Sequence, residues 1–413
     1  TRMVEQLLGV ARATSVAELR ESLATVQGVP WSYTLALDDQ GDVFFGDISN
    51  VPAVPAALLS ECPTALTPLL RPLGIHVLDG GRSACEWTGR LPAADLPALM
   101  RSDYVANSNN NHELPNLSAP LGGYSPILGD EDTALSLRAS LGLAMIEERL
   151  EGSDGLGEPG FTGPLARDVF RLARNRGGEL LADAIVTDCL AEPTGTWDGA
   201  EVDLTEICTT LAAWDRRNGV GSVGALVFAG LWASLADTGE LASIFAMPAD
   251  RDDPLGTPSG YSSSMNTRVA VRNALARVQL TLADLGIPAT APWGDVNAVL
   301  GPMGPRGVPG GQGSQGIFDV IESADGYGTW SGWTAALEGV APPDLFGASY
   351  VHLVTFGPDG PEAEGLLAYS QATELDSPWY MDQLDAYSQG EWFTFPFTEA
   401  AIIADPNLTQ IDL

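Results

Sequence analysis

The order of hydrophobic patterns along the chain constrains its fold most. Alternation typical of β-strands occurs near both ends, at Trp31–Gly46, Ser349–Phe356 and Glu364–Ser370. Apolar residues at helical spacing dominate from Thr133 to Phe245 and return at Val269–Leu285. Strand blocks on either side of a long helical region are typical of an α+β fold.

Finer signals place individual elements. Residues 4–27 are predicted to be helical with Ser15 as a cap, and the DDQGD sequence predicts a hairpin turn. The remaining predictions are a loop with a short helix at 86–103, loops at 246–262 and 301–316, a strand starting at Gly316 (GIFDVI), and helices at Tyr380–Tyr387 and Thr398–Ala404.

A chain of 413 residues is long enough to bury a full core. We expect residues 1–132 to hold a core hairpin and the Asn-rich stretch described below. Residues 133–290 should be mainly helical, and residues 291–413 should return to core strands and end in helices. All three parts are expected to form one domain.

The charge of the chain is strongly negative and uneven. Net charge is -34, all 20 basic residues are arginine, and none follows Arg306. Such a surface repels phosphate backbones and anionic lipids, so the composition argues against nucleic-acid and membrane partners. No apolar run reaches the roughly 18 to 20 residues that span a bilayer. The absence of lysine excludes Schiff-base chemistry by a lysine of this chain.

Four cysteines fall into two close pairs, Cys62 with Cys85 and Cys189 with Cys208. Neither pair has the CxxC spacing of a zinc or thioredoxin site. Pairing of neighbours is the simplest disulfide framework and would indicate an oxidising compartment. Four buried free thiols are the alternative.

An Asn-rich stretch, which we define as Tyr104–Leu141, contains Asn107, Asn109, Asn110 and Asn111 and ends in a helix that carries Arg138. Asparagine tolerates the left-handed backbone of abrupt turns, so a turn is one interpretation. The other is that one amide is a neutral hydrogen-bond donor aimed at a developing oxyanion.

Other catalytic patterns are absent. The sequence has no Walker loop, no GxGxxG after a strand, no HExxH and no GxSxG. It holds three histidines, His76, His112 and His352. We expect His352 to be structural and His112 to face solvent, which leaves a serine–histidine–acid triad without support.

Several long segments, in this order, resemble the penicillin amidase family of N-terminal-nucleophile hydrolases, in particular the branch of aculeacin A acylase and the acyl-homoserine-lactone acylases. They cover nearly the full chain: ARATSVAELRESLATVQGVPWSYTLALDDQGDVFFGDISNVP, VLDGGRSACEW, YVANSNNNHEL with GYSPILGDEDTALSLR, LAAWDRR, GIFDVI and EGLLAYSQATELDSPWYMDQLDAYSQGEWFTFPF. The neighbour pairing of the cysteines is also similar to that branch.

The resemblance implies an αββα sandwich and a secreted precursor that cuts itself into α and β subunits. It implies an N-terminal serine that attacks an amide through its own amine as base, without a metal or histidine triad. Asn109 matches the family's oxyanion asparagine, and Arg138 matches the arginine that supports this asparagine and the nucleophile's amine. We expect no cofactor; calcium, an option among relatives, has no support in these residues.

The resemblance also implies that the chain is a β-subunit fragment that lacks the nucleophile, since Thr1 opens a helical pattern rather than a buried strand. The fragment alone is then expected to be inactive. Its partners would be the α subunit and the rest of the β subunit, with a signal peptide upstream and a secreted or periplasmic location. Expected substrates are linear acyl amides such as lipopeptide antibiotics, N-acyl-homoserine lactones or penicillins. The alternatives are an inactive relative that serves as a binding protein and an unrelated disulfide-bonded interaction protein.

Overall fold

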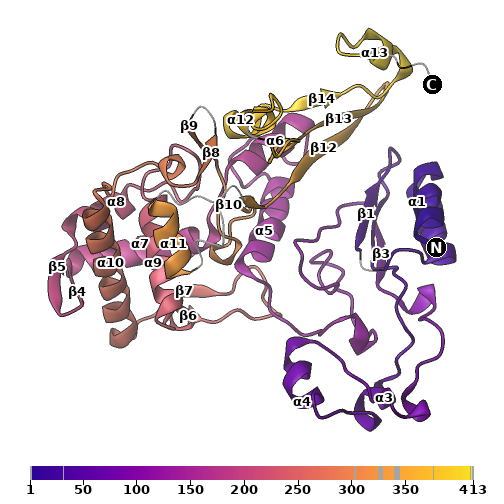
Figure 1. Cartoon of the computed structure of the whole chain (residues 1–413), viewed down its shortest axis with the longest axis horizontal. Helices are drawn as coiled ribbons and strands as arrows, with labels where there is room; N and C mark the ends of the chain where they lie inside the picture. Colours follow the sequence, from indigo (N-terminus) through magenta and orange to yellow (C-terminus); the bar gives the residue numbers. More distant parts are fainter. Residues whose placement is uncertain are drawn as a thin grey trace. The chain divides into compact units, whose positions relative to one another are not determined.

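A computed structural model describes residues 2–30, 32–301, 304–323, 329–338, 345–374, 376–409 and 411 (Figure 1). The chain divides into two compact units, Thr1–Thr133 and Ala134–Leu413, each of which is described by itself. Helices and small antiparallel sheets occur together, so the predicted α+β class is confirmed. The expected division at 132 and 290 stays a prediction.

The first unit, called unit 1 below, begins with two helices that precede a three-stranded antiparallel sheet. Helices α1 (Arg2–Arg12) and α2 (Val16–Val26) are separated by the predicted cap, where Ser15 Oγ accepts the Glu18 N–H at 3.2 Å. The sheet has the order β1 (Thr34–Leu37), β2 (Val43–Gly46), β3 (Ala98–Arg101). Strand β3 lies where a loop was predicted, so that prediction was wrong.

The core of unit 1 forms between α2 and this sheet. Its buried residues are Val16, Leu23, Phe44, Ile48, Val51 and Leu96. Short helices α3 (Ala56–Glu61) and α4 (Thr67–Leu70) follow the sheet's second strand. A disulfide then joins Cys62 to Cys85, with Cα atoms 5.7 Å apart.

The second unit, unit 2, is built around a helix that is buried on all sides. Helix α9 (Ala225–Asp237) reads ALVFAGLWASLAD, and such a sequence without a polar face requires a core position. Figure 1 shows it beside α8 (Thr205–Ala212), α10 (Met265–Leu285) and α11 (Trp330–Leu337), which contact it. Helix α7 (Arg176–Ala191) is tied to α8 by the disulfide Cys189–Cys208.

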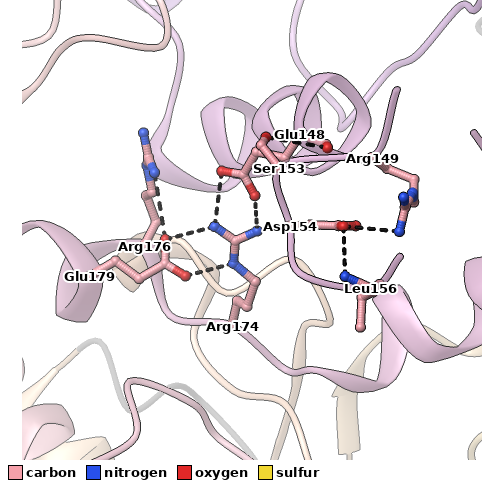
Figure 2. Close-up of polar contacts among 8 residues, drawn as sticks. All are labelled: Glu148, Arg149, Ser153, Asp154, Leu156, Arg174, Arg176 and Glu179. Atoms are coloured by element: carbon pink, nitrogen blue, oxygen red, sulfur yellow. Dashed lines mark hydrogen bonds and ion pairs between the residues drawn. The ribbon is translucent and has the colours of Figure 1, made fainter. Parts of the chain in front are cut away.

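Two further helices open unit 2. Helix α5 (Leu137–Glu151) ends where predicted, because its C-cap Gly152 adopts the left-handed conformation with φ 72°. Helix α6 (Gly163–Arg171) follows a glycine-rich loop. An ion pair between Arg149 and Asp154 ties this loop to α5 (Figure 2). Figure 2 also shows Arg174 between Glu148 of α5 and Glu179 of α7.

Strands of unit 2 form short hairpins and one larger sheet. The pairs are β4 (Thr194–Trp197) with β5 (Ala200–Asp203), β6 (Phe245–Met247) with β7 (Ser259–Tyr261), β8 (Ala298–Gly301) with β9 (Gly304–Gly307), and β10 (Ile321–Ser323) with β11 (Leu345–Gly347). The first pair lies within the predicted helical region. Apart from Phe245, the second pair lies in the predicted loop 246–262, and β9 lies in the predicted loop 301–316. The strand predicted from Gly316 was also wrong before Ile321, because Gly313–Gln315 forms a short helix and Gly316 caps it with φ 81°.

The C-terminal part agrees with the sequence. Figure 1 shows β12 (Tyr350–Gly357), β13 (Gly360–Leu367) and β14 (Phe393–Phe395) side by side, with the predicted turn between the first two. Helices α12 (Asp382–Gln389) and α13 (Glu399–Ala404) match the predicted ones. No helix formed by the described residues is both long and apolar enough to cross a membrane.

Candidate functional site

The Asn-rich stretch forms a tight turn whose apex is Asn109. Its φ of 63° lies in the left-handed region, which asparagine tolerates better than most residues. Asn107 Oδ1 accepts the Asn109 N–H at 2.9 Å, and Asn110 Oδ1 accepts the Ser108 N–H at 2.9 Å. The side chain of Asn109 is exposed. The turn therefore presents this asparagine on a backbone fixed by its neighbours' side chains.

The residues after the turn attach it to the segment 130–133 of the same unit. Asn111 Nδ2 donates to the Asp130 carbonyl and to Thr133 Oγ1, both at 2.9 Å. The buried Glu113 carboxylate accepts the Asp132 N–H at 2.8 Å and the Asn111 amide at 2.7 Å. These bonds replace the hydrogen bonds to water that a carboxyl group loses when it is buried.

His112 lies between these two anchors and is fully buried, so the prediction that it faces solvent was wrong. Its Nε2 lies 3.2 Å from Glu131 Oε1. The Glu131 carboxylate also accepts the N–H groups of Gly123 and Tyr124, and these bonds, together with the His112 contact, lower its pKa although burial opposes them. Sequence reasoning missed Glu113 and Glu131 as well. The HE pair directly behind the asparagines was the available signal.

Arg138 lies in the first turn of α5, whose cap Ser136 accepts the Ala139 N–H at 3.2 Å. Burial lowers the pKa of its guanidinium. A Cβ at Gly313 would lie 3.3 Å from Arg138 Cδ, so the arginine side chain passes close to this glycine. Arg138 belongs to unit 2 and Asn109 to unit 1. The roles assigned to these two residues stay predictions.

The other predicted residues occupy structural positions. All four cysteines are buried and paired as the spacing suggested. His352 is exposed on β12 and stacks on Tyr350, with ring centroids 5.0 Å apart. Among the described residues, no three histidine, cysteine or acidic side chains are grouped so as to hold a metal ion.

Unit 1 also contains an apolar cavity of about 620 Å³ next to the Cys62–Cys85 disulfide. Its walls include Leu59, Leu78 and Trp87, and His76 and Glu86 contribute polar groups. The volume lies within the range of small-molecule sites. Neither Asn109 nor His112 is among its lining residues.

Unit 2 holds a buried acid–phenol pair that no sequence pattern indicated. Tyr387 donates its hydroxyl hydrogen to Asp319 Oδ2 within an apolar cluster that includes Val308, Ile321 and Leu384. Burial raises the pKa of Asp319 to about 7, and the bond from Tyr387 opposes this rise in part. Burial also raises the pKa of Tyr387 well above its usual value.

A neutral amide on a fixed, exposed turn can donate to an oxygen that gains charge during a reaction. An amide donor held in this way is compatible with acyl transfer. Residues 1–404 match the family model described as penicillin amidase. The chain belongs to the penicillin amidase family.

Curated relatives of the chain belong to the branch of this family that the sequence resembles. The chain is 38% identical to aculeacin-A acylase of Actinoplanes utahensis over 421 residues, which is 98% of this chain and 50% of the relative. It is 34% identical to the acyl-homoserine lactone acylase PvdQ of Pseudomonas putida, over 100% of this chain and 50% of the relative. The corresponding protein of Pseudomonas syringae is 32% identical, with coverages of 98% and 50%. The chain thus spans about half the length of the curated relatives it matches, and the branch inferred from the sequence is confirmed.

Proposed function

We propose that the enzyme containing this chain is an acylase that hydrolyses the linear amide between an acyl group and an amine. Membership of the penicillin amidase family and the names of two groups of relatives support this activity. The geometry of the Asn109 turn carries the proposal, because an exposed amide held on a fixed backbone is what oxyanion stabilisation requires.

In this mechanism a serine hydroxyl attacks the amide carbonyl while the serine's own α-amino group takes its proton. The carbonyl oxygen becomes an oxyanion, to which the Asn109 side-chain amide donates. Collapse of the tetrahedral intermediate breaks the C–N bond, and the leaving amine takes the proton from the α-ammonium group. Water then attacks the acyl ester and releases the acid. The proposed nucleophile is an N-terminal serine that lies outside these 413 residues.

Arg138 is proposed to support both Asn109 and the amine of the nucleophile. A guanidinium keeps its charge at any ordinary pH, even with the lowered pKa that burial causes. Its positive charge beside the α-amino group would favour the neutral amine, which is the form that can act as a base. Placement on a helix, packed against Gly313, restricts the positions this side chain can adopt.

The proposed substrates follow the relatives' names: a lipopeptide of the aculeacin type or an acyl-homoserine lactone, with penicillins as a further option. The proposed partners are an α subunit and the remaining part of the β subunit. We further propose an oxidising, secreted or periplasmic location, which two disulfides support. The net charge of -34 supports a small-molecule substrate over a nucleic acid.

The test is hydrolysis by the complete, processed enzyme. Purified protein with both disulfides formed is incubated with a fatty acyl-homoserine lactone, a fatty-acyl lipopeptide and a phenylacetyl amide, and mass spectrometry follows release of the free amine. We expect at least one amide to be cleaved, whereas residues 1–413 alone should cleave none. A folded, processed enzyme that cleaves no acyl amide would contradict the proposal.

A further inference from the structure

We propose that His112 is a positioning residue for the turn that carries Asn109. Its buried imidazole joins the end of this turn to Glu131. This inference rests on the proposed function in one respect only: the turn is taken to present Asn109 to the substrate. The structural part of the inference concerns unit 1 alone.

The acceptor of the His112 contact is itself immobilised. Glu131 Oε2 accepts the Gly123 N–H at 2.8 Å, and Oε1 accepts the Tyr124 N–H at 2.9 Å. The same Oε1 lies 3.2 Å from His112 Nε2. The Tyr124 ring meets the imidazole edge-on, with centroids 5.3 Å apart and an interplanar angle of 88°. Two chain segments therefore define the place of the imidazole ring.

Three successive residues attach the turn to one loop. Asn111 and Glu113 reach the segment 130–133 through the bonds described above, and His112 between them reaches Glu131. The chain runs directly from Asn109 through Asn110 into this anchor. Because Asn109 holds a left-handed conformation, a shift of the anchor would change the direction of its amide.

The environment of His112 Nδ1 indicates that this ring does more than fill space in the core. Nδ1 is inaccessible to solvent and has no hydrogen-bond partner among the described residues. A buried polar atom left unpaired is unfavourable, and an apolar ring of similar size would avoid the loss. We therefore attribute the histidine at this position to its Nε2 contact with Glu131.

Other charged groups near the ring are acidic. Burial raises the pKa of the Asp47 carboxyl, and a hydrogen bond from Ser49 and an electrostatic interaction with the nearby His112 oppose this rise in part. Glu113 follows His112 in the chain and is also buried. The groups that interact with the ring are thus Glu131, Asp47 and the ring of Tyr124, and no arginine is bonded to it among the described residues.

The variants are His112→Phe, which keeps a ring but no Nε2–H, and His112→Gln, which keeps an N–H donor. His352→Phe is the control, since His352 is exposed on β12 and its ring stacks on Tyr350, outside the Asn-rich stretch. In the complete enzyme we expect His112→Phe to lower kcat roughly 10- to 100-fold with KM within about twofold. His112→Gln should recover at least part of kcat, and His352→Phe should leave kcat unchanged.

Hydrogen exchange gives a readout that needs no turnover. We expect the amides of residues 104–113 to exchange faster in His112→Phe than in the unaltered enzyme, and His352→Phe to leave them unchanged. A double-mutant cycle with Glu131→Gln should be non-additive in kcat, since both changes remove the same contact. Unchanged exchange and kcat in folded His112→Phe would overturn the inference. So would an equal effect of His352→Phe, or a His112→Gln variant that recovers nothing. If the unaltered enzyme cleaves no amide, the proposed function fails, and hydrogen exchange still decides the role of His112.

Discussion

Replacing Arg149 by methionine tests how the loop between α5 and α6 is held. The Arg149 side chain is fully buried, and its Nη1 lies 2.9 Å from Asp154 Oδ1 (Figure 2). Its Nη2 donates to the carbonyls of Gly157, at 3.0 Å, and Glu158. The main-chain carbonyl of Arg149 also accepts the Gly160 N–H at 3.0 Å. Arg149 thus bonds to several points of a loop that contains several glycines and has little apolar surface of its own.

The expected loss in the free energy of unfolding follows from the groups that Arg149→Met leaves without a partner. The Asp154 side chain is only 6% exposed, so Arg149→Met leaves a buried carboxylate that keeps one bond, from the Leu156 N–H. Removing one partner of a buried ion pair destabilises proteins by about 3–5 kcal/mol. Replacing both partners by apolar residues removes the unpaired charge. The double variant Arg149→Met/Asp154→Leu should therefore recover most of that loss.

Urea denaturation measures these changes, with hydrogen exchange of residues 152–160 as a local readout. Arg251→Met is the control in the same unit, because its ion pair with Asp252 spans 3.6 Å and those side chains are 39% and 87% exposed. Such a pair contributes at most about 1 kcal/mol. The reasoning would be refuted if Arg149→Met lowered the free energy of unfolding no more than Arg251→Met does.

Two further predictions concern stability. Because burial raises the pKa of Asp319 to about 7, above the value of about 3.9 in an unfolded chain, the folded state binds the extra proton between these values. The free energy of unfolding should thus fall as pH rises from about 4 to 7, by up to about 4 kcal/mol. In Asp319→Asn urea denaturation should show this part of the pH dependence lost, and an unaltered profile would contradict it. Replacing Cys189 and Cys208 together by serine should lower the free energy of unfolding by about 3 kcal/mol, as expected for a loop of 19 residues. A loss no larger than that of an exposed Ser153→Ala control would show that the bond contributes little.

Local signals in the sequence predicted most helices and the hairpins β1–β2 and β12–β13. Ser15 was predicted as a cap and Thr398 as the start of a helix, and both accept the N–H three residues ahead. The turn between β12 and β13 was equally local, since Gly357 pairs with Gly360. Such features depend on a few neighbouring residues, and their physical cause can be read directly from the residue types.

Non-local contacts explain what the sequence did not reveal. Strand β3 exists because Leu99 pairs with Phe45, a partner far away along the chain, while its own four residues show no alternation. GIFDVI has the pattern of a strand, but the left-handed Gly316 and the buried Asp319 set its path.

The candidate site also combines features that depend on local sequence with features that depend on distant residues. The role of Asn109 was predicted from its place in the NSN motif, which matches a family, and it stays a prediction. The burial of His112 could not, because it depends on Glu131, 19 residues further along. A histidine in a loop carries no periodic pattern that would indicate which side faces the core.

The kcat of Asn109→Gly tests the central claim most directly. Glycine adopts a φ of 63° without strain, so this variant removes the amide and keeps the turn, which alanine would not do. Asp198→Gly is the matched control, as an exposed residue with φ 50° in the other unit. In the complete enzyme acting on the acyl amide it cleaves best, we expect Asn109→Gly to lower kcat about 10²- to 10³-fold. We expect Asp198→Gly to leave kcat unchanged. An Asn109→Gly enzyme that turns over as fast as the unaltered one would contradict the assignment of Asn109 as the oxyanion donor.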